Sequence, residues 1–349
     1  MGANQIINII SSKLHLTLRK NAFILRSILT SFDLAAYYVL WIKALQLLLL
    51  PLDLILSLLE RLLLPKLDTS DQPIVFVVGI HRTGSTFVSQ VLADCFPFAL
   101  VGNHNTLFPR SKYFIHLLLK QFYKKGRFKN RSYKSYYGIS RGFYSIGDSY
   151  EIWDRWLGGS HYYKPDEISK RKRDEMREYF AYLGKSWGKT IIAKNNRNML
   201  LIKELKEIFP NAFFVVVNRG RAEVIQSTIQ ASKDFFGSDD YMWGLRPSEN
   251  FSMEDYDNKM EAYCHQYLEL EKVLKRQLEE LSPDRYAEVL YEEFCADPVS
   301  HLEMIKGKIS SAHKVTFEAN TADGLSYKSS QRLSDSELTT EIETILAEI

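Results

Sequence analysis

Cysteine is scarce in this sequence. The 349 residues include three cysteines, Cys95, Cys264 and Cys295, which lie far apart and are odd in number. They form neither a metal-binding spacing nor a disulfide framework. We therefore expect a reduced compartment, where thiols stay unpaired.

A large excess of charge of one sign is also missing. The formal net charge is +3, with 46% hydrophobic and 25% charged residues. This composition is globular and excludes a disordered chain. The charge is too small to indicate a nucleic-acid-binding protein, and no RNA-binding motif is present, so we expect no nucleic-acid partner.

No uncharged apolar run reaches the roughly 18 residues of a clear membrane-spanning helix. Residues 22–66 are nonetheless rich in leucine, interrupted by Asp33, Lys43 and Asp53. Pro51 predicts a break or kink. We favour an anchor on a membrane surface, with basic residues at both ends. A pair of helices packed on the rest of the chain and a true spanning helix are the alternatives. A cleavable signal peptide is not indicated, because the run is too long and starts too late.

From residue 72 onward, short apolar runs alternate with helical patterns. Continuous apolar runs are typical of strands buried on both faces of a parallel sheet. We predict an α/β domain over residues 71–349, with helices on both faces of its sheet, preceded by an N-terminal helical segment over residues 1–70. Strands are expected at 74–80, 190–194, 212–218 and 286–294, and helices at 84–95, 198–209, 222–232, 253–281 and 298–308.

The first strand–helix junction has a phosphate-binding pattern without its usual lysine. Residues 79–86 read GIHRTGST. The backbone N–H groups of such a loop converge on a phosphate, which the helix N-terminus also favours. In nucleoside triphosphatases a lysine follows the second glycine, but Ser85 stands there, and Arg82 is the one basic side chain of the loop apart from His81. The loop can hold a phosphate-like group without a triphosphate–magnesium clamp. Its candidate ligands are His81, Arg82, Thr83, Gly84, Ser85 and Thr86.

A second strand–turn–helix pattern carries arginines at its turn. Residues 218–227 read NRGRAEVIQS, with Arg219 and Arg221 at the turn. Ser227 follows Arg219 by about two helical turns. If both strands are parallel, both turns lie at the same edge of the sheet, where open α/β sheets bind ligands.

Together these two motifs resemble the sulfotransferase superfamily, with the bacterial and protein-tyrosine branch the most similar. The resemblance implies that residues 79–86 bind the 5′-phosphosulfate of 3′-phosphoadenosine 5′-phosphosulfate. It implies that Arg219 and Ser227 bind the 3′-phosphate. It also implies that no metal is required, which accounts for the missing lysine. The segments 194–217 and 284–302 extend the resemblance.

The sequence departs from the family pattern at three places. Many cytosolic members have lysine where Arg82 stands. Asn196 replaces the usual proline after Lys194 and Asn195, and Gly220 replaces a frequent acidic neighbour of the arginine. None of these changes removes a phosphate ligand, so we expect an active enzyme that transfers a sulfuryl group to a hydroxyl.

Sulfuryl transfer needs positive charge at the transferred group and a proton acceptor. Arg82 and Lys194 are the candidates for the charge. For the proton acceptor we choose Glu151 first, in the segment GDSYEIWDRW, and His104 second, in GNHNTLFP.

The acceptor molecule is not identified by any motif. The stretch between Cys95 and Gly147 contains ten Lys and Arg residues and no acid. Beside a leucine-rich N-terminus, this favours an anionic lipid surface or an acidic acceptor. The acceptor can be a small molecule, a lipid or a glycan. We expect the protein to be associated with a membrane, on its cytoplasmic face. The alternative functions are a P-loop kinase or NTPase and a non-catalytic nucleotide-binding membrane protein.

Overall fold

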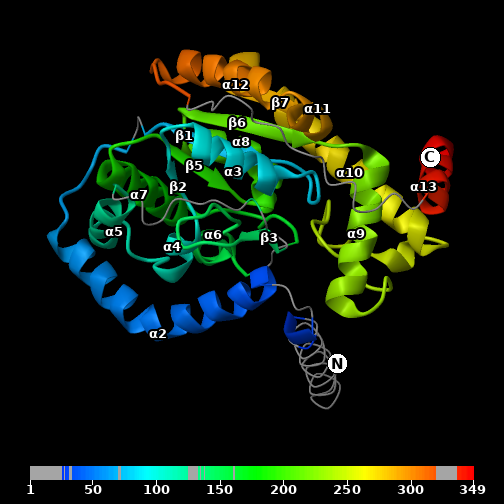
Figure 1. The fold of residues 1–349 in the computed structure, drawn as a ribbon, viewed down its shortest axis with the longest axis horizontal. Coiled ribbons are helices and arrows are strands. Elements are labelled where there is room, and N and C mark those ends of the chain that lie inside the picture. The colour runs from blue at the N-terminus through cyan, green and yellow to red at the C-terminus, as the bar shows by residue number, and fades with distance from the viewer. Residues whose placement is uncertain are drawn as a thin grey trace.

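A computed structural model describes most of the chain (Figure 1). The described residues are 26, 28–30, 34–69, 72–124, 133, 135–136, 138–159, 162–319 and 336–349. Two basic segments noted in the sequence, Arg19–Lys20 and most of 124–134, lie outside these residues.

The centre of the molecule is a five-stranded parallel sheet. Its order is β2-β5-β1-β6-β7, so β1 lies in the middle with β5 on one side and β6 on the other. The predicted parallel α/β architecture is therefore confirmed. The strands are β1 (Ile74–Val78), β2 (Ala99–Leu100), β5 (Ile191–Lys194), β6 (Ala212–Asn218) and β7 (Tyr286–Leu290).

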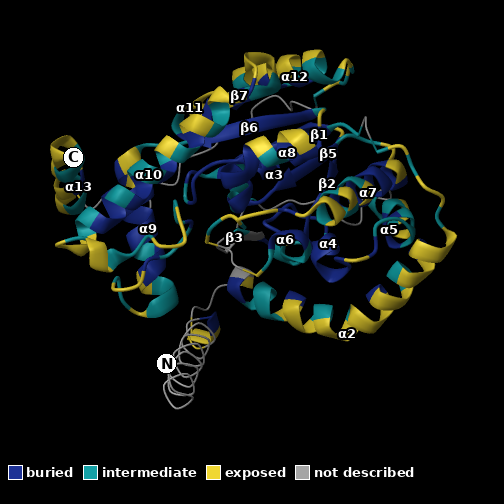
Figure 2. Ribbon diagram, turned by 180° about the vertical axis from the view of Figure 1, so that it is seen from behind, coloured by how far each residue is buried: buried dark blue, intermediate teal, exposed yellow. Residues whose placement is uncertain are grey.

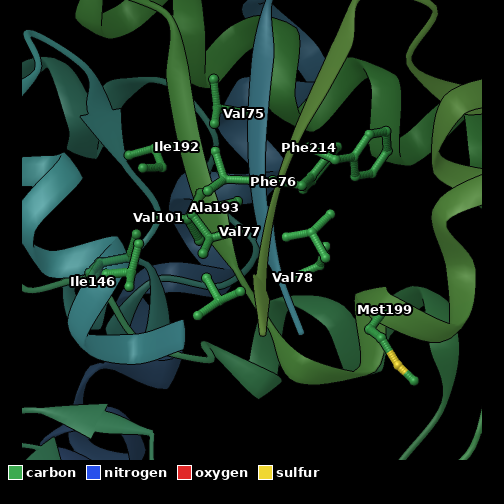
Figure 3. Packing of buried hydrophobic residues seen from close by; sticks show 14 of the residues in the cluster. Val75, Phe76, Val77, Val78, Val101, Ile146, Ile192, Ala193, Met199 and Phe214 are labelled. Carbon is green, nitrogen blue, oxygen red and sulfur yellow. The ribbon is translucent and has the colours of Figure 1, made fainter. Parts of the chain in front are cut away.

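The sheet interior explains why the strand sequences are continuously apolar. Every residue of β1 is fully buried, because the sheet has neighbours on both faces and both edges of this strand are paired. Phe76 stacks on Phe214 of β6 with ring centroids 5.6 Å apart, at the heart of the cluster in Figure 3. The position of the loop after β1 is fixed by this rigid strand.

Helices flank the sheet, as Figure 1 shows. The longer ones after β1 are α7 (Lys170–Trp187), α9 (Arg221–Phe236), α10 (Lys259–Glu279), α12 (Pro298–His313) and α13 (Ser336–Glu348). Shorter helices are α3 (Ser85–Cys95), α4 (Asn103–Leu107), α5 (Phe114–Lys124), α6 (Tyr150–Leu157), α8 (Ile202–Ile208) and α11 (Tyr291–Ala296). The 3-10 turns are η1 (Asn196–Leu201), η2 (Met253–Asp255) and η3 (Pro283–Arg285), and β3 (Ser135–Tyr136) pairs with β4 (Ile139–Ser140) in a small antiparallel hairpin.

Several predicted element boundaries were wrong, among them the end of one strand and the start of one helix. The strand expected over 286–294 ends at Leu290, and helix α11 begins at Tyr291, where Tyr291 and Phe294 turn the same face inward. The helix expected from 253 begins at Lys259, because the Asn258 side chain accepts a hydrogen bond from the Glu261 N–H (2.8 Å) and caps it.

The leucine-rich segment forms one helix rather than a pair. Helix α2 (Leu34–Leu63) continues through Pro51 and bends around the domain (Figure 1). The proline removes one backbone donor, which the rest of a 30-residue helix tolerates as a bend. Residues Ala36–Leu63 are long and apolar enough to cross a membrane.

Candidate functional site

The loop between β1 and α3 turns tightly before the helix begins. Arg82 and Gly84 both adopt the left-handed conformation, with φ of 67° and 84°. At Gly84 a Cβ atom would lie 2.3 Å from the ring of Tyr291, so only glycine fits there. The Thr83 hydroxyl donates to the Ile80 carbonyl (2.8 Å) and closes the turn. The N-terminus of α3 follows directly, and its first residues are Ser85 and the half-buried Thr86.

The two predicted phosphate motifs meet at this loop. The Arg82 guanidinium donates from Nε to the Ser227 hydroxyl on α9 (2.8 Å). Arg219, at the end of β6, donates from Nη1 to the Arg82 carbonyl (3.3 Å). Segments that are 145 residues apart in the sequence thus supply adjoining cations and a hydroxyl to one place.

Arg219 also contacts Tyr291 and Glu292, the first two residues of α11, which directly follow β7. Its guanidinium lies over the Tyr291 ring, 5.0 Å from the centroid, and its Nε donates to Glu292 (3.3 Å). The stacked ring fixes the plane of the guanidinium. The Glu292 carboxylate competes with any anion that Arg219 binds.

His81 ties the loop to a neighbouring segment instead of offering a charge. Its Nδ1 accepts a hydrogen bond from the Leu245 N–H (3.1 Å), and its ring meets Trp243 edge to face. Burial, and then the charge of Arg82, lower the pKa of His81 to about 3. The ring is neutral at physiological pH and helps to hold Trp243 beside Arg82, whose guanidinium lies 5.9 Å from that indole.

Lys194 is enclosed with a carboxylate at the end of β5. Its Nζ donates to Oδ1 of Asp148 (2.8 Å), and both side chains are only 1% exposed. Asn195 and Asn196 also bind Asp148, through its carbonyl (2.7 Å) and its Oδ1 (3.1 Å). Ser85 donates to Asn196 (3.1 Å), which connects this pair to the phosphate loop.

The hairpin formed by β3 and β4 covers the same pair. At Gly138, in its turn, a Cβ atom would lie 1.9 Å from Asp148 Oδ2 and 3.7 Å from Lys194 Nζ. The backbone at this glycine has φ of 88°, which a larger residue would resist. The backbone turn at Gly138 therefore lies against the Lys194–Asp148 pair.

Glu151 lies on α6, one turn beyond Asp148. Its carboxylate forms an ion pair with Lys43 of α2, and its side chain is 14% exposed. Burial lowers the pKa of Lys43, and the negative charge of Asp154 partly opposes this effect. The first-choice proton acceptor thus faces the N-terminal helix.

His104 lies in an aromatic cluster away from the loop. It is fully buried, and its ring stacks on Tyr144 with centroids 4.7 Å apart and meets His116 at 5.5 Å. Burial, followed by the proximity of His116, lowers the pKa of His104 well below its usual value. Among the described residues neither ring nitrogen has a hydrogen-bond partner. The structure does not bring this side chain to Arg82 or Lys194.

The sequence did not single out Asp148, Trp243, Tyr291 or Glu292. Asp148 was one of three acids in GDSYEIWDRW, and only the fold shows that it reaches Lys194. Tyr291 and Glu292 lay inside the strand expected over 286–294, so the sequence did not place them at the edge where the strand ends. Across the described ranges, no cluster of three or more His, Cys, Asp or Glu side chains could hold a metal ion.

Comparisons with known proteins point to one family. A family model described as "Sulfotransferase family" matches residues 73–309. The chain resembles sulfotransferase STF1 from Mycobacterium tuberculosis H37Rv, with 12% identity, a TM-score of 0.47, and coverage of 84% of this chain and 82% of that one. It also resembles STF9 from Mycobacterium avium, with 15% identity, a TM-score of 0.46, and coverage of 73% and 69%. No curated protein sequence matches.

Proposed function

The chain belongs to the sulfotransferase family, and we propose that it transfers a sulfuryl group from 3′-phosphoadenosine 5′-phosphosulfate to a hydroxyl of an acceptor. The observation that carries this proposal is the meeting of Arg82, Ser227 and Arg219 at one edge of the sheet. Two cations and a hydroxyl suit a ligand with two separate phosphate groups. The donor supplies the sulfuryl group.

Each of these residues has a separate proposed role in binding the sulfuryl donor or in stabilising charge during transfer. The loop around Gly84 and the N-terminus of α3 provide backbone N–H groups for the phosphosulfate. Arg82 and Lys194 offset the negative charge that grows on the oxygens during transfer. Asp148 holds Lys194 in place through the 2.8 Å contact. Arg219 and Ser227 bind the 3′-phosphate.

Glu151 is our proposed proton acceptor. It stands in the first turn of α6, three residues after Asp148, which precedes the N-cap residue of that helix. Asp148 already accepts from Lys194 and Asn196 through one oxygen. Lys43 of α2 forms an ion pair with Glu151 and so holds its carboxylate in place on α6.

We also propose that the chain works at a membrane, with its catalytic domain on the cytoplasmic side. Helix α2 supports the proposed membrane association, because it exposes many leucines. Three free and buried cysteines support a reducing compartment. A small molecule, a lipid or a glycan can carry the acceptor hydroxyl.

The donor assignment is tested by calorimetry with adenosine 3′,5′-bisphosphate. Arg219→Ala and Ser227→Ala should each weaken its binding by roughly 1.5–3 kcal/mol, because each loses a contact to a charged phosphate. The same variants should bind adenosine 5′-monophosphate as the unaltered chain does. Arg221→Ala is the matched control, since that arginine lies one residue beyond Gly220 but pairs with Glu271 (2.9 Å).

Two results would contradict the donor assignment. Equal weakening of both nucleotides would show that Arg219 and Ser227 do not bind the 3′-phosphate. Tight binding of ATP with magnesium, and none of the bisphosphate, would favour a P-loop kinase or NTPase. Label transfer from the phosphosulfate donor to acceptors in a cell extract separates an enzyme from a non-catalytic nucleotide-binding protein.

A further inference from the structure

Helix α2 turns its acids toward the domain and its leucines outward. The inner stripe contains Ile42, Asp53 and Glu60, each no more than 1% exposed. Asp53 and Glu60 are seven residues apart and therefore lie on one face of the helix. An ordinary surface helix has the opposite arrangement, with its charges in water.

The two carboxylates bind a run of consecutive backbone groups. Asp53 accepts hydrogen bonds from the N–H groups of Arg110 (3.1 Å) and Ser111 (2.9 Å), and from the Ser111 hydroxyl (2.8 Å). Glu60 accepts from the N–H groups of the next three residues, Lys112, Tyr113 and Phe114, at 2.7–2.9 Å. Helix α5 begins at Phe114, so Glu60 caps its N-terminus. Five N–H groups depend on α2 for their partners.

The outer face of α2 is almost entirely aliphatic. Figure 2 shows it as a long exposed band across the molecule. Leu47, Leu48 and Leu62 are 71–75% exposed. Basic residues Arg61 and Lys66 lie exposed at the C-terminal end, and Trp41 is exposed toward the N-terminal end. The other exposed members are Leu50, Leu52, Leu54, Ile55, Leu58, Leu59 and Leu63.

We propose that α2 lies along the surface of a lipid bilayer, with its outer leucines among the acyl chains and Asp53 and Glu60 fastened to the domain. This inference rests on the proposed membrane association, and not on the identity of the sulfuryl donor. It specifies the orientation of the helix, which runs parallel to the membrane and does not cross it.

The hydrogen bonds of the acids oppose a spanning orientation. A helix that crossed the bilayer over 36–63 would leave the domain surface. Asp53 and Glu60 would then enter hydrocarbon without partners, and the N–H groups of 110–114 would lose their acceptors. A helix parallel to the surface keeps all these bonds and still buries its leucines.

The composition of the outer face fits lipid better than a protein partner. Protein interfaces mix aromatic and polar groups with apolar ones. From Leu47 to Leu59 the exposed large side chains of α2 are leucine and isoleucine. Trp41 near one end, with Arg61 and Lys66 at the other, matches the side chains that prefer the headgroup region and its anionic charge.

The same helix lies beside the proposed reaction site. It packs on β3 and β4, the hairpin whose turn covers Lys194 and Asp148, and its Lys43 pairs with Glu151. A bilayer held by α2 would therefore place lipid headgroups near these residues. This location favours an acceptor hydroxyl carried by a lipid or another molecule that partitions into the membrane.

Depth measurements in vesicles test the orientation. Leu48→Cys, Ile55→Cys and Leu62→Cys, made one at a time in the full chain, carry an environment-sensitive fluorophore at positions about two helical turns apart on the outer face. The native cysteines are buried, so the label goes to the new thiol. Quenching by lipids brominated at different acyl positions, in phosphatidylcholine–phosphatidylserine vesicles, reports the depth of each label. Val299→Cys on α12, 40% exposed, is the matched control.

A helix parallel to the surface gives three similar, shallow depths, and the control label stays in water. A spanning helix gives depths that change by about 10 Å from one label to the next, because seven residues rise by that distance. That gradient would overturn the orientation but leave the membrane association intact. No quenching and no co-sedimentation with vesicles would overturn both the orientation and the membrane association. The nucleotide calorimetry described above tests the sulfuryl donor independently of this result.

A second variant confirms which face binds. Replacing Leu48, Ile55 and Leu62 by glutamine together should weaken vesicle binding at least tenfold, whereas Val299→Gln with Met304→Gln should not. Circular dichroism establishes that both variants are folded. Unchanged vesicle binding of the folded triple variant would overturn the assignment of the outer face.

Discussion

Lys194 and Asp148 form the most enclosed ion pair among the described residues close to the phosphate loop. Two charges at 1% exposure are stable only together, because an unpaired charge at such a site is strongly unfavourable. The pair therefore fixes the position of the ammonium group, which is what a stabilising cation in transfer chemistry requires. The neighbouring carboxylate, Glu151, has a separate partner in Lys43.

Substitutions separate the roles of the two carboxylates. Glu151→Gln should keep nucleotide affinity and lower kcat by roughly 10²–10⁴, because it removes the proton acceptor but preserves shape. Asp148→Asn should lower kcat and also destabilise the fold, because Lys194 would lose its counter-charge. His104→Phe should leave kcat unchanged. A large loss in His104→Phe, with normal turnover in Glu151→Gln, would transfer the proton-acceptor role to His104.

Candidate site residues that belong to local sequence patterns could be proposed from the sequence. Arg82 and Ser85 follow from the loop spacing, and Arg219 with Ser227 from the resemblance to a family. Asp148 could not be chosen among its neighbours, because its contact with Lys194 spans 46 residues and depends on how α6 approaches the sheet. The burial of His104 was equally hidden, since Tyr144 and Trp187, which enclose it, come from distant segments.

Among the elements, α2 shows most clearly what composition alone leaves undecided. Its leucine content predicted an apolar helix, and Asp53 was read as an interruption of that helix. In the structure Asp53 and Glu60 are the points of attachment to 110–114. Strands β1 and β6, in contrast, were predictable from composition. Each is buried on both faces, and nearly all of its residues are apolar.

Removal of both acids from α2 should loosen the helix from the domain. Asp53→Leu with Glu60→Leu leaves five backbone N–H groups without acceptors, and hydrogen bonds to charged groups contribute about 1.5–3 kcal/mol each. We expect the free energy of unfolding to fall by at least about 3 kcal/mol in chemical denaturation. The matched control is Lys43→Leu, which removes a partly exposed ion pair and should cost less than about 1 kcal/mol. Equal stability of the double variant and the unaltered chain would disprove the attachment.

At the scale of the whole molecule, three buried histidines and the half-buried His313 make the fold sensitive to acid. Burial lowers the pKa of His81 to about 3 and those of His116 and His313 to about 4, and it lowers the pKa of His104 well below its usual value. In the unfolded chain each histidine titrates near 6.5. The unfolded state therefore binds more protons below that pH, and stability is lost as the pH falls.

We expect the free energy of unfolding to be nearly constant above pH 7 and to fall between pH 6.5 and 4. Each of the four histidines contributes up to about 2 kcal/mol of loss from pH 6.5 to 5. Denaturation followed at several pH values measures this slope. His104→Phe should recover about 2 kcal/mol at pH 5 relative to pH 7.5. An unchanged slope in that variant would show that His104 is protonated in the folded chain.

The outward leucines of α2 also have a consequence for enzyme kinetics at a membrane. A protein held flat on a bilayer meets a lipid acceptor by diffusion in two dimensions. Its turnover then depends on the mole fraction of acceptor in the membrane and not on the amount per volume of solution. Diluting the acceptor with inert lipid would slow the reaction, whereas adding more vesicles of the same composition would leave the rate per bound enzyme unchanged.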